Sequence, residues 1–573
     1  MKKPHRKSRR RNAPHQGSGP KSPGHASTAA ASSVPVIKGA SSPKLEAMPA
    51  RCWRDRLFEP IDIASIAVFR ISFGLLLLYD VYLYFGNGWI KSYYIDPPYH
   101  FAFFGFDFIR PLPGDGMYLL FGVLAVCAVL ITVGLFYRLA MTVFFLGFSY
   151  VFLLEEARYL NHFYLVGLFA FLMIFVPAAR GWSLDALIAG RAQDARVAAW
   201  SLWILRVQVE IMLIYAGIVK LNVDWLQGEP LGRWLSKKTD LSIIGPLLVN
   251  DNVILIGAWG AALLHLIGAV MLLFRSTRIY AFSAYCLFHF LNHNFFVIGI
   301  FPWLTIAATL LFFDPDWPKT VWRNITRILP IPSMPSWALH DKVPERPWHI
   351  PSPAMRTAVA ALVVGWAMFQ TLLPVRHWLY PGNHLWHEQG VRFAWQMMLR
   401  QKGSVAMFYV HDRATNREWL VDPRQFLTRR QTRHMGQRPE MIRQFARYLK
   451  TVWSERYNAS NVEVRAFTAV SLNGRRSQAL IDSNRDLTKI GYSFGHSDWI
   501  LPLREPMPPK AERWPLDGLM TLLHNMKADP AVGRLLASRE NKKVSDRPSA
   551  TTGEVSSGPS HIGKALTPSR ANY

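Results

Sequence analysis

Nine apolar runs dominate the first two-thirds of this chain and restrict what it can fold into. A helix needs ~20 apolar residues to cross a bilayer, and within lipid all of its backbone polar groups must bond inside the helix. We therefore expect a mainly α protein, a polytopic transmembrane helical bundle of about nine spans. The runs cover residues 61–86, 116–137, 138–155, 160–178, 200–221, 252–274, 277–294, 295–313 and 356–374.

The chain carries 65 Lys and Arg against 38 Asp and Glu, a formal net charge of +27. Much of this excess flanks the apolar runs, for example at Arg138, Arg180 and Arg275. Basic loops stay in the cytoplasm, so the amino terminus is expected inside and, after an odd number of spans, the carboxy-terminal region outside. This rule explains much of the charge, and we expect the lipid bilayer as a partner and no nucleic acid.

Composition divides the chain into four regions. Residues 1–55 are expected to form a disordered basic tail, and residues 56–375 the transmembrane domain. Residues 376–515 are expected to form an extracytoplasmic α+β domain, and residues 516–573 a helix followed by a disordered tail.

Beyond residue 375, polar segments alternate with short apolar runs, which is typical of a small soluble domain. Three runs predict β-strands, namely VAMFYV, VEVRAFTAV and SQALI. The segment PEMIRQFARYLKTVW between them predicts one helix.

Lys220 is the most informative single residue, since it ends the apolar run 200–221. A charged side chain at membrane depth is costly, so an ionisable residue there is a candidate functional residue. Desolvation favours the neutral amine, which is a base. The alternative is a lysine at a helix end whose head reaches out to water.

Other polar side chains interrupt the apolar runs. Residues three or four apart share a helix face, so His289, Asn292 and His293 could point at one cavity. His162 and Lys220 both fall at outer ends of their runs and could meet in one pocket. The remaining groups have plainer explanations: a mutual ion pair for Arg206 and Glu210, and packing for His265. No metal-ligand spacing and no disulfide framework can be drawn from these residues and the three cysteines, so no metal is predicted.

Several segments match a known family, in the right order along the chain. They include PIDIASIAVFRISFG, LNHFYLVGL, LRVQVEIMLIYAGIVKLNVDWLQG, FHFLNHNFFVIGIF, LLPVRHWLY, FAWQMML and ALIDSNRDL. On these motifs the chain resembles the vitamin K-dependent γ-glutamyl carboxylases, whose membrane part is of the HTTM type. The resemblance covers roughly residues 60–505.

The resemblance implies a membrane enzyme that carboxylates peptide glutamate while a quinone is epoxidised. In this family a lysine deprotonates reduced vitamin K, oxygen converts it into a strong base, that base removes the γ-proton of glutamate, and carbon dioxide adds to the carbanion. The cofactor expected here is a menaquinol-type hydroquinone, with oxygen and carbon dioxide as co-substrates and a glutamate-containing peptide as partner. The implied site residues are Lys220 and His162 for catalysis, His289, Asn292, Arg206 and His377 for the cofactor, and Trp395 and Met398 for the peptide.

One departure from the family concerns a disulfide. Animal members link an outer loop to the soluble domain by this bond, and the corresponding places here are His100 and about Arg447. Docking of the soluble domain is therefore expected to rest on packing. With the basic tail, this points to a bacterial plasma membrane protein. Two alternatives stay open, an epoxidase-only relative without carboxylation and a non-enzymatic sensor or transporter with the same fold.

Overall fold

The structure is a computed structural model that describes residues 52–190, 196–240, 245–329, 332, 348–509 and 518–545. Most of the predicted amino-terminal tail and residues 546–573 of the predicted carboxy-terminal tail lie outside this range.

Each of the nine apolar runs contains a helix. Six helical segments are long and apolar enough to cross a membrane: α2 (Ala64–Gly86), α3 (Gly116–Val133), α4 (Tyr137–Leu154), α7 (Trp200–Ile218), the segment Asp251–Leu273, and Pro353–Leu379, which begins with α16 (Pro353–Val375). Two apolar helices are shorter, α5 (Asn161–Phe175) and the segment Phe301–Phe312. The ninth run forms α12 (Arg278–Phe295). These helices confirm the predicted polytopic bundle and an integral membrane protein, while the number of spans stays approximate.

Shorter elements connect these helices and give the bundle its irregular ends. The segment Asp251–Leu273 consists of α10 (Asp251–Leu263), the π-helical turn η5 (Leu264–Gly268) and α11 (Ala269–Leu273). The others include α1 (Trp53–Arg56), β1 (Pro60–Asp62), η2 (Glu156–Arg158), α6 (Leu184–Ile188), β2 (Arg196–Ala198), α8 (Val223–Leu226), α9 (Leu231–Leu235), α13 (Phe301–Thr309), α14 (Trp317–Ile328) and α17 (His384–His387).

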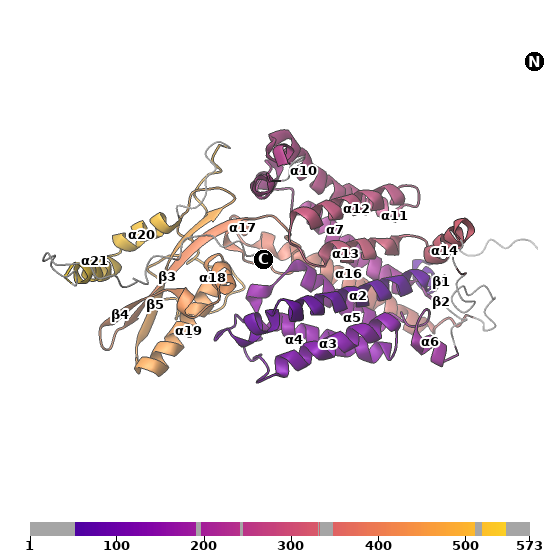
Figure 1. Cartoon of the computed structure of the whole chain (residues 1–573), viewed down its shortest axis with the longest axis horizontal. Coiled ribbons are helices and arrows are strands. Elements are labelled where there is room, and N and C mark those ends of the chain that lie inside the picture. The colour runs from indigo at the N-terminus through magenta and orange to yellow at the C-terminus, as the bar shows by residue number, and fades with distance from the viewer. Residues whose placement is uncertain are drawn as a thin grey trace, which may run out of the picture. The chain divides into compact units, whose positions relative to one another are not determined.

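Helix α7 is the most buried of the six spans, and Figure 1 shows it in the helical part of the molecule near α12 and α13. In its most apolar 18-residue window 72% of the residues are buried inside the protein, against 44% or less in the other five spans. It packs against η5, α16, α13 and α10, while α2, α3, α4 and α5 pack in chain order beside it. A Cβ at Gly217 would lie 2.6 Å from the Leu266 side chain, so glycine permits the close approach of η5 to α7.

The soluble part has a three-stranded antiparallel sheet in the order β4 (Arg417–Val421), β3 (Lys402–Asp412) and β5 (Val462–Leu472). Alternate side chains of β3 face opposite sides. Phe408 packs with Phe445 of α19 (Pro439–Tyr457), and Tyr409 packs in a cluster that includes Leu522 of α20 (Gly518–Ala528). Helices α18 (Arg429–Gly436) and α21 (Pro530–Ser545) complete this part.

The predicted strands 405–410 and 462–470 and the predicted helix 439–453 are present within β3, β5 and α19. The predicted strand SQALI is wrong. It makes only isolated bridges, Val470 with Gln478 and Ile481 with Ile500. Its other backbone groups bond elsewhere, since Leu480 N donates to the Thr468 hydroxyl and Leu480 O accepts from Leu501 N.

The loop near residue 100 docks on α18 and α19 without any cysteine. The Tyr99 ring lies 4.4 Å from the Tyr448 ring, and the Gln431 amide donates to Tyr99 O at 2.7 Å. The Gln444 amide donates to Ala102 O at 3.1 Å. Packing and hydrogen bonds therefore hold this loop where animal relatives of the resembled family are expected to have a disulfide.

Candidate functional site

Lys220 turns into the protein two residues beyond the end of the α7 span. Its side chain is 4% exposed, its Nζ donates to Ala216 O at 2.6 Å, and it lies 5.4 Å from the Trp225 ring centroid. Among the described residues no carboxylate lies within ion-pair distance of this nitrogen. Burial lowers the pKa of Lys220 to about 7. These observations disfavour the lysine whose head reaches water and favour a buried amine that can be neutral.

The turn that follows Lys220 is fixed from two sides. Asn222 caps α8 by accepting from Trp225 N at 3.0 Å, and Trp225 Nε1 donates to Ala258 O of α10 at 2.8 Å. On the soluble side, both carboxylate oxygens of Asp224 accept from the Arg475 guanidinium at 2.8 Å. The amide of Asn473 donates to the same carboxylate at 2.9 Å. The segment that carries the lysine is therefore clamped to the end of β5.

Two buried histidines lie beyond this turn, one on η5, which packs against α7, and one on α12, which packs against η5. His265 lies on η5, close enough to Lys220 for an electrostatic interaction, and its Nδ1 bonds Ala261 O at 2.6 Å. His289 on α12 is 1% exposed, and neither of its ring nitrogens has a hydrogen-bond partner among the described residues. The Phe288 ring lies 5.1 Å from His265 and 5.2 Å from His289. Unpartnered buried nitrogens are costly, which makes His289 a candidate ligand-binding group.

His162 lies at the first turn of α5. Its ring is 6.3 Å from Phe301, and the same phenylalanine lies 5.8 Å from His289. The predicted meeting of His162 and Lys220 is therefore indirect, because a row of rings that contains Phe288, His289 and Phe301 lies between them. We call this row, the rings of Phe288 and Phe301 with the imidazoles of His265, His289 and His162, the aromatic wall.

The segment that carries Trp395 and Met398 lies over the beginning of α5. The Asn161 amide donates to Gln396 O at 3.3 Å, and the Trp395 ring lies 4.9 Å from Tyr164. Trp395 is fully buried with its Nε1 unpartnered within the described part of the chain, whereas Met398 is 38% exposed.

Four non-glycine residues of this segment have left-handed backbone conformations. The φ angles are +57° at Glu388, +61° at Phe393, +53° at Trp395 and +56° at Met398. Such conformations cost energy and persist only where the surroundings enforce them, and they concentrate at functional sites. The segment is therefore a candidate substrate-binding element for two reasons, its strained backbone and the FAWQMML motif.

Two family models match the chain. The model described as "HTTM domain" matches residues 58–317, and that described as "Vitamin K-dependent gamma-carboxylase, lumenal domain" matches residues 355–506. The chain belongs to the vitamin K-dependent gamma-carboxylase family. No solved structure matches it. The family gives the protein a membrane-bound, vitamin K-dependent carboxylase-like function.

The buried groups of this family member suit a hydroquinone. A ring with two hydroxyls needs aromatic walls, a base and hydrogen-bonding nitrogens. Phe288 and Phe301, the Lys220 amine and the orphaned nitrogens of His289 provide them. These residues would hold the group.

Other candidate residues lie apart from this wall. His293 is exposed beside Trp303 and Asn292 is half-buried, so of the predicted α12 face only His289 is fully inside. His377 is 1% exposed at the end of α16, where its Nδ1 bonds Pro374 O at 2.6 Å and its ring lies 4.6 Å from His384.

The expected ion pair of Arg206 with Glu210 is wrong. Arg206 donates to Leu311 O at 2.8 Å and to Phe313 O at 3.0 Å, because these carbonyls at the end of the α13 segment face its guanidinium. The carboxylate of Glu210 is buried, and within the described residues neither oxygen has a hydrogen-bond partner. Arg206 therefore links α7 to the end of the α13 segment. Its role as a cofactor ligand stays a prediction.

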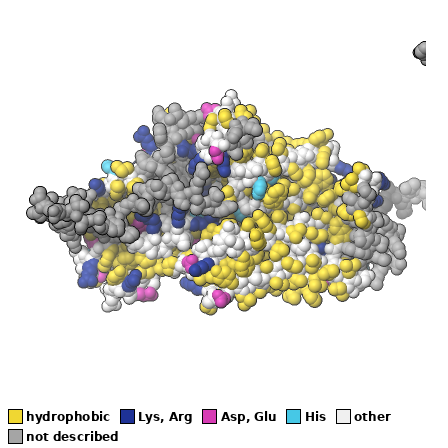
Figure 2. All heavy atoms as spheres, viewed as in Figure 1, with side chains coloured by type: hydrophobic (Ala, Val, Ile, Leu, Met, Phe, Trp, Pro, Cys, Tyr) yellow, Lys and Arg dark blue, Asp and Glu magenta, His cyan; other side chains and the backbone are white. Residues whose placement is uncertain are grey.

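The soluble domain of this carboxylase-family chain is basic. Residues 376–509 carry 21 Lys and Arg against 11 Asp and Glu. Figure 2 shows the contrast, with dark blue side chains over the sheet-containing part and hydrophobic ones over the helical part. This excess of basic residues favours acidic partners.

Proposed function

We propose that this protein uses a menaquinol-type reduced vitamin K, oxygen and carbon dioxide to carboxylate glutamate side chains of a peptide while the quinone is epoxidised. The buried amine of Lys220, which has no carboxylate partner among the described residues, carries the proposal, because deprotonation of a hydroquinone requires a neutral base that is kept from water. When bound, the reduced quinone with oxygen supplies the strong base that removes the γ-proton of glutamate.

The residues of the chain would divide the work by position. Lys220 accepts a proton from the hydroquinone hydroxyl, and the nearby His265 ring helps to accommodate the resulting ammonium. His289 and His162 orient the reacting oxygens from the aromatic wall. The strained segment with Trp395 and Met398 presents the peptide over α5, next to His162. In this proposal the segment lies on the outer side of a plasma membrane, as the charges of the loops favour.

The deciding assay uses the full chain in lipid nanodiscs with reduced vitamin K, labelled bicarbonate and a glutamate peptide. Label in the peptide together with epoxide supports the proposal. Epoxide without label selects an epoxidase-only relative. If folded protein forms neither epoxide nor labelled peptide, both enzymatic functions are contradicted and a non-enzymatic role is left.

The rate of epoxide formation should rise with pH from 6 to 8. With a pKa of about 7, Lys220 is mostly an ammonium at pH 6 and mostly a free amine at pH 8. Because only the amine accepts a proton, the rate at pH 6 should be about one-tenth of the plateau. Initial rates with saturating hydroquinone at constant ionic strength measure this. A profile that stays flat over this range would contradict the role of Lys220.

Peptide binding should weaken with salt. The soluble domain carries ten more basic than acidic residues over 376–509, and exposed charges are screened as ionic strength increases. The KM for a glutamate-rich peptide should rise several-fold between 50 and 300 mM salt, whereas the KM for hydroquinone should stay the same. An equal change in both would point to a general effect of salt on the protein.

A further inference from the structure

Three exposed aromatic rings gather where the loop near residue 100 meets the soluble domain. The Phe104 ring stacks on the Tyr492 ring at 3.9 Å, and the Phe494 ring lies 5.0 Å from Phe104 and 5.1 Å from Tyr492. We call these three residues the aromatic patch. Their side chains are 53%, 41% and 71% exposed, so packing within the described part of the chain leaves much of each ring uncovered. Apolar surface that is exposed in a cluster indicates a contact with something else.

Two hydrogen bonds locate the patch at the ends of membrane spans. Tyr380 directly follows the span Pro353–Leu379, and its hydroxyl donates to Phe494 O at 2.7 Å. The loop near residue 100 is tied to another span, because the hydroxyl of Tyr150 on α4 donates to Arg110 O. Tyr150 lies four residues before α4 ends. Since both spans end beside the patch, its rings lie where the spans pass from hydrocarbon to headgroups.

The chemistry of this surface suits lipid headgroups. Aromatic side chains concentrate at the boundary between membrane and water, where an apolar ring with a polar edge is at home. The exposed surface continues onto the span itself, because Trp378 and Leu379 at its end are 53% and 80% exposed. In the loop near residue 100, Phe108 is 77% exposed beside the exposed charges of Asp107 and Arg110. This continuity with a membrane span favours the bilayer as the partner of the patch.

We infer that Phe104, Tyr492 and Phe494 rest in the headgroup layer of the bilayer and attach the soluble domain to the membrane surface. Two of these rings belong to the soluble domain, which thus has a lipid contact of its own besides its covalent link to the last span. The attachment does not depend on the activity proposed above.

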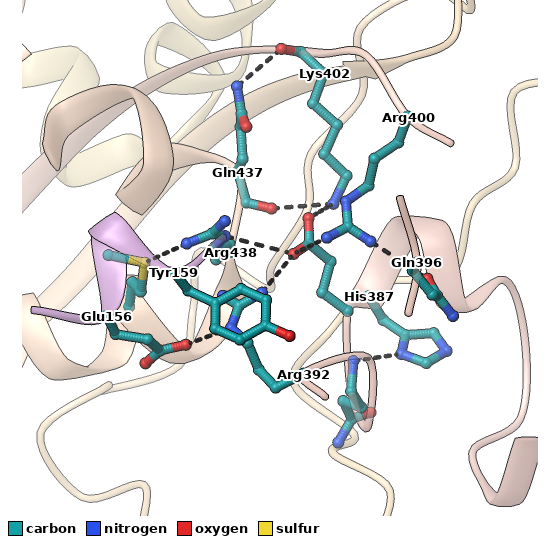
Figure 3. A network of polar contacts seen from close by, with 12 residues as sticks. Glu156, Tyr159, His387, Arg392, Gln396, Arg400, Lys402, Gln437 and Arg438 are labelled. Carbon is teal, nitrogen blue, oxygen red and sulfur yellow. Dashed lines mark hydrogen bonds and ion pairs between the residues drawn. The ribbon is translucent and has the colours of Figure 1, made fainter. Parts of the chain in front are cut away.

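The attached loop also holds the beginning of the candidate substrate segment. The Gln389 amide donates to Gly495 O and to the Ser497 hydroxyl, both at 3.1 Å. The preceding residue, Glu388, is buried and pairs with Lys402 at 2.9 Å and Arg400 at 3.2 Å (Figure 3). The segment is therefore held between an ion cluster and a loop that lies on the membrane, which sets its height above the bilayer.

The test measures membrane depth on the full chain in nanodiscs, with the three native cysteines replaced by alanine. An NBD fluorophore is attached at Phe494→Cys or at Gly491→Cys, which keeps all three rings and where a Cβ meets nothing within 4 Å. A nitroxide on the lipid headgroup should quench both labels by at least half, and iodide in the water should quench them little. Ala414→Cys is the matched control, because this exposed residue follows the far end of β3, ~33 Å along the strand from Lys402. Its label should respond to iodide and not to the lipid nitroxide.

A second measurement asks whether the rings make the contact. Replacing both Phe104 and Tyr492 with serine should raise iodide quenching at Gly491→Cys several-fold, with circular dichroism to verify folding. Unchanged quenching in this variant overturns the inference. Iodide quenching at Phe494→Cys and Gly491→Cys as strong as at Ala414→Cys also overturns it, and leaves the patch for a protein partner.

Discussion

Replacing Lys220 with alanine is expected to abolish epoxide formation and carboxylation together while the protein still folds. A positioned base contributes ~10²–10⁴-fold to a rate, and no other amine among the described residues is placed against the aromatic wall of His265 and His289. Removal of this buried amine leaves a small apolar gap. Initial rates of epoxide formation by purified protein measure the loss, and circular dichroism verifies the fold.

Lys237→Ala is the matched control, because that lysine is exposed on the segment that follows α9 and its replacement should leave both activities unchanged. Lys220→Arg should also be inactive, since a guanidinium does not deprotonate at working pH. Near-normal epoxide formation by Lys220→Ala would remove the central role assigned to this residue.

Replacing Asp224 with alanine is expected to have the second largest effect, on stability and activity together. The change leaves the Arg475 guanidinium buried without its partner, and breaking a buried pair in this way costs about 3–5 kcal/mol. It also releases the turn that positions Lys220, so the rate of epoxide formation should fall as well. Thermal unfolding in nanodiscs and initial rates measure the two effects.

A double-mutant cycle separates this clamp from a general loss of packing. Arg475→Ala should destabilise the protein similarly, and the double variant should cost much less than the two single changes together. Asp240→Ala, at an exposed position, should leave stability and rate unchanged. Additive losses would mean that Asp224 and Arg475 act independently.

Long apolar runs allowed the membrane part to be predicted well. Lipid leaves few ways to satisfy a backbone, so each run had to contain a helix, and the structure has one in each. Lys220 could be singled out because a charged amine at the end of an apolar run is costly to place at membrane depth. The strands 405–410 and 462–470 could be predicted because the sheet is covered on both faces, so that each strand is rich in apolar residues.

What could not be predicted depends on contacts between distant segments. His265 looked like a packing residue because nothing in an apolar run indicates a π-helical turn, which here brings its ring toward Lys220. Arg392 pairs with Glu156, which lies 236 residues earlier, and Arg438 pairs with Glu388. No local sequence pattern joins these residues. Arg206 had a suitable partner four residues away and bonded two carbonyls more than a hundred residues away instead.

The ring contact between Tyr99 and Tyr448 has a consequence for how this protein matures. The loop near residue 100 is joined to α19 by this ring contact and an amide hydrogen bond, and the three cysteines of the chain are free thiols. Assembly of the two parts therefore needs no oxidising enzyme and no particular thiol balance in its compartment. Dithiothreitol should leave the melting temperature unchanged. The protein can be produced in reducing cells without losing the contact between this loop and α19.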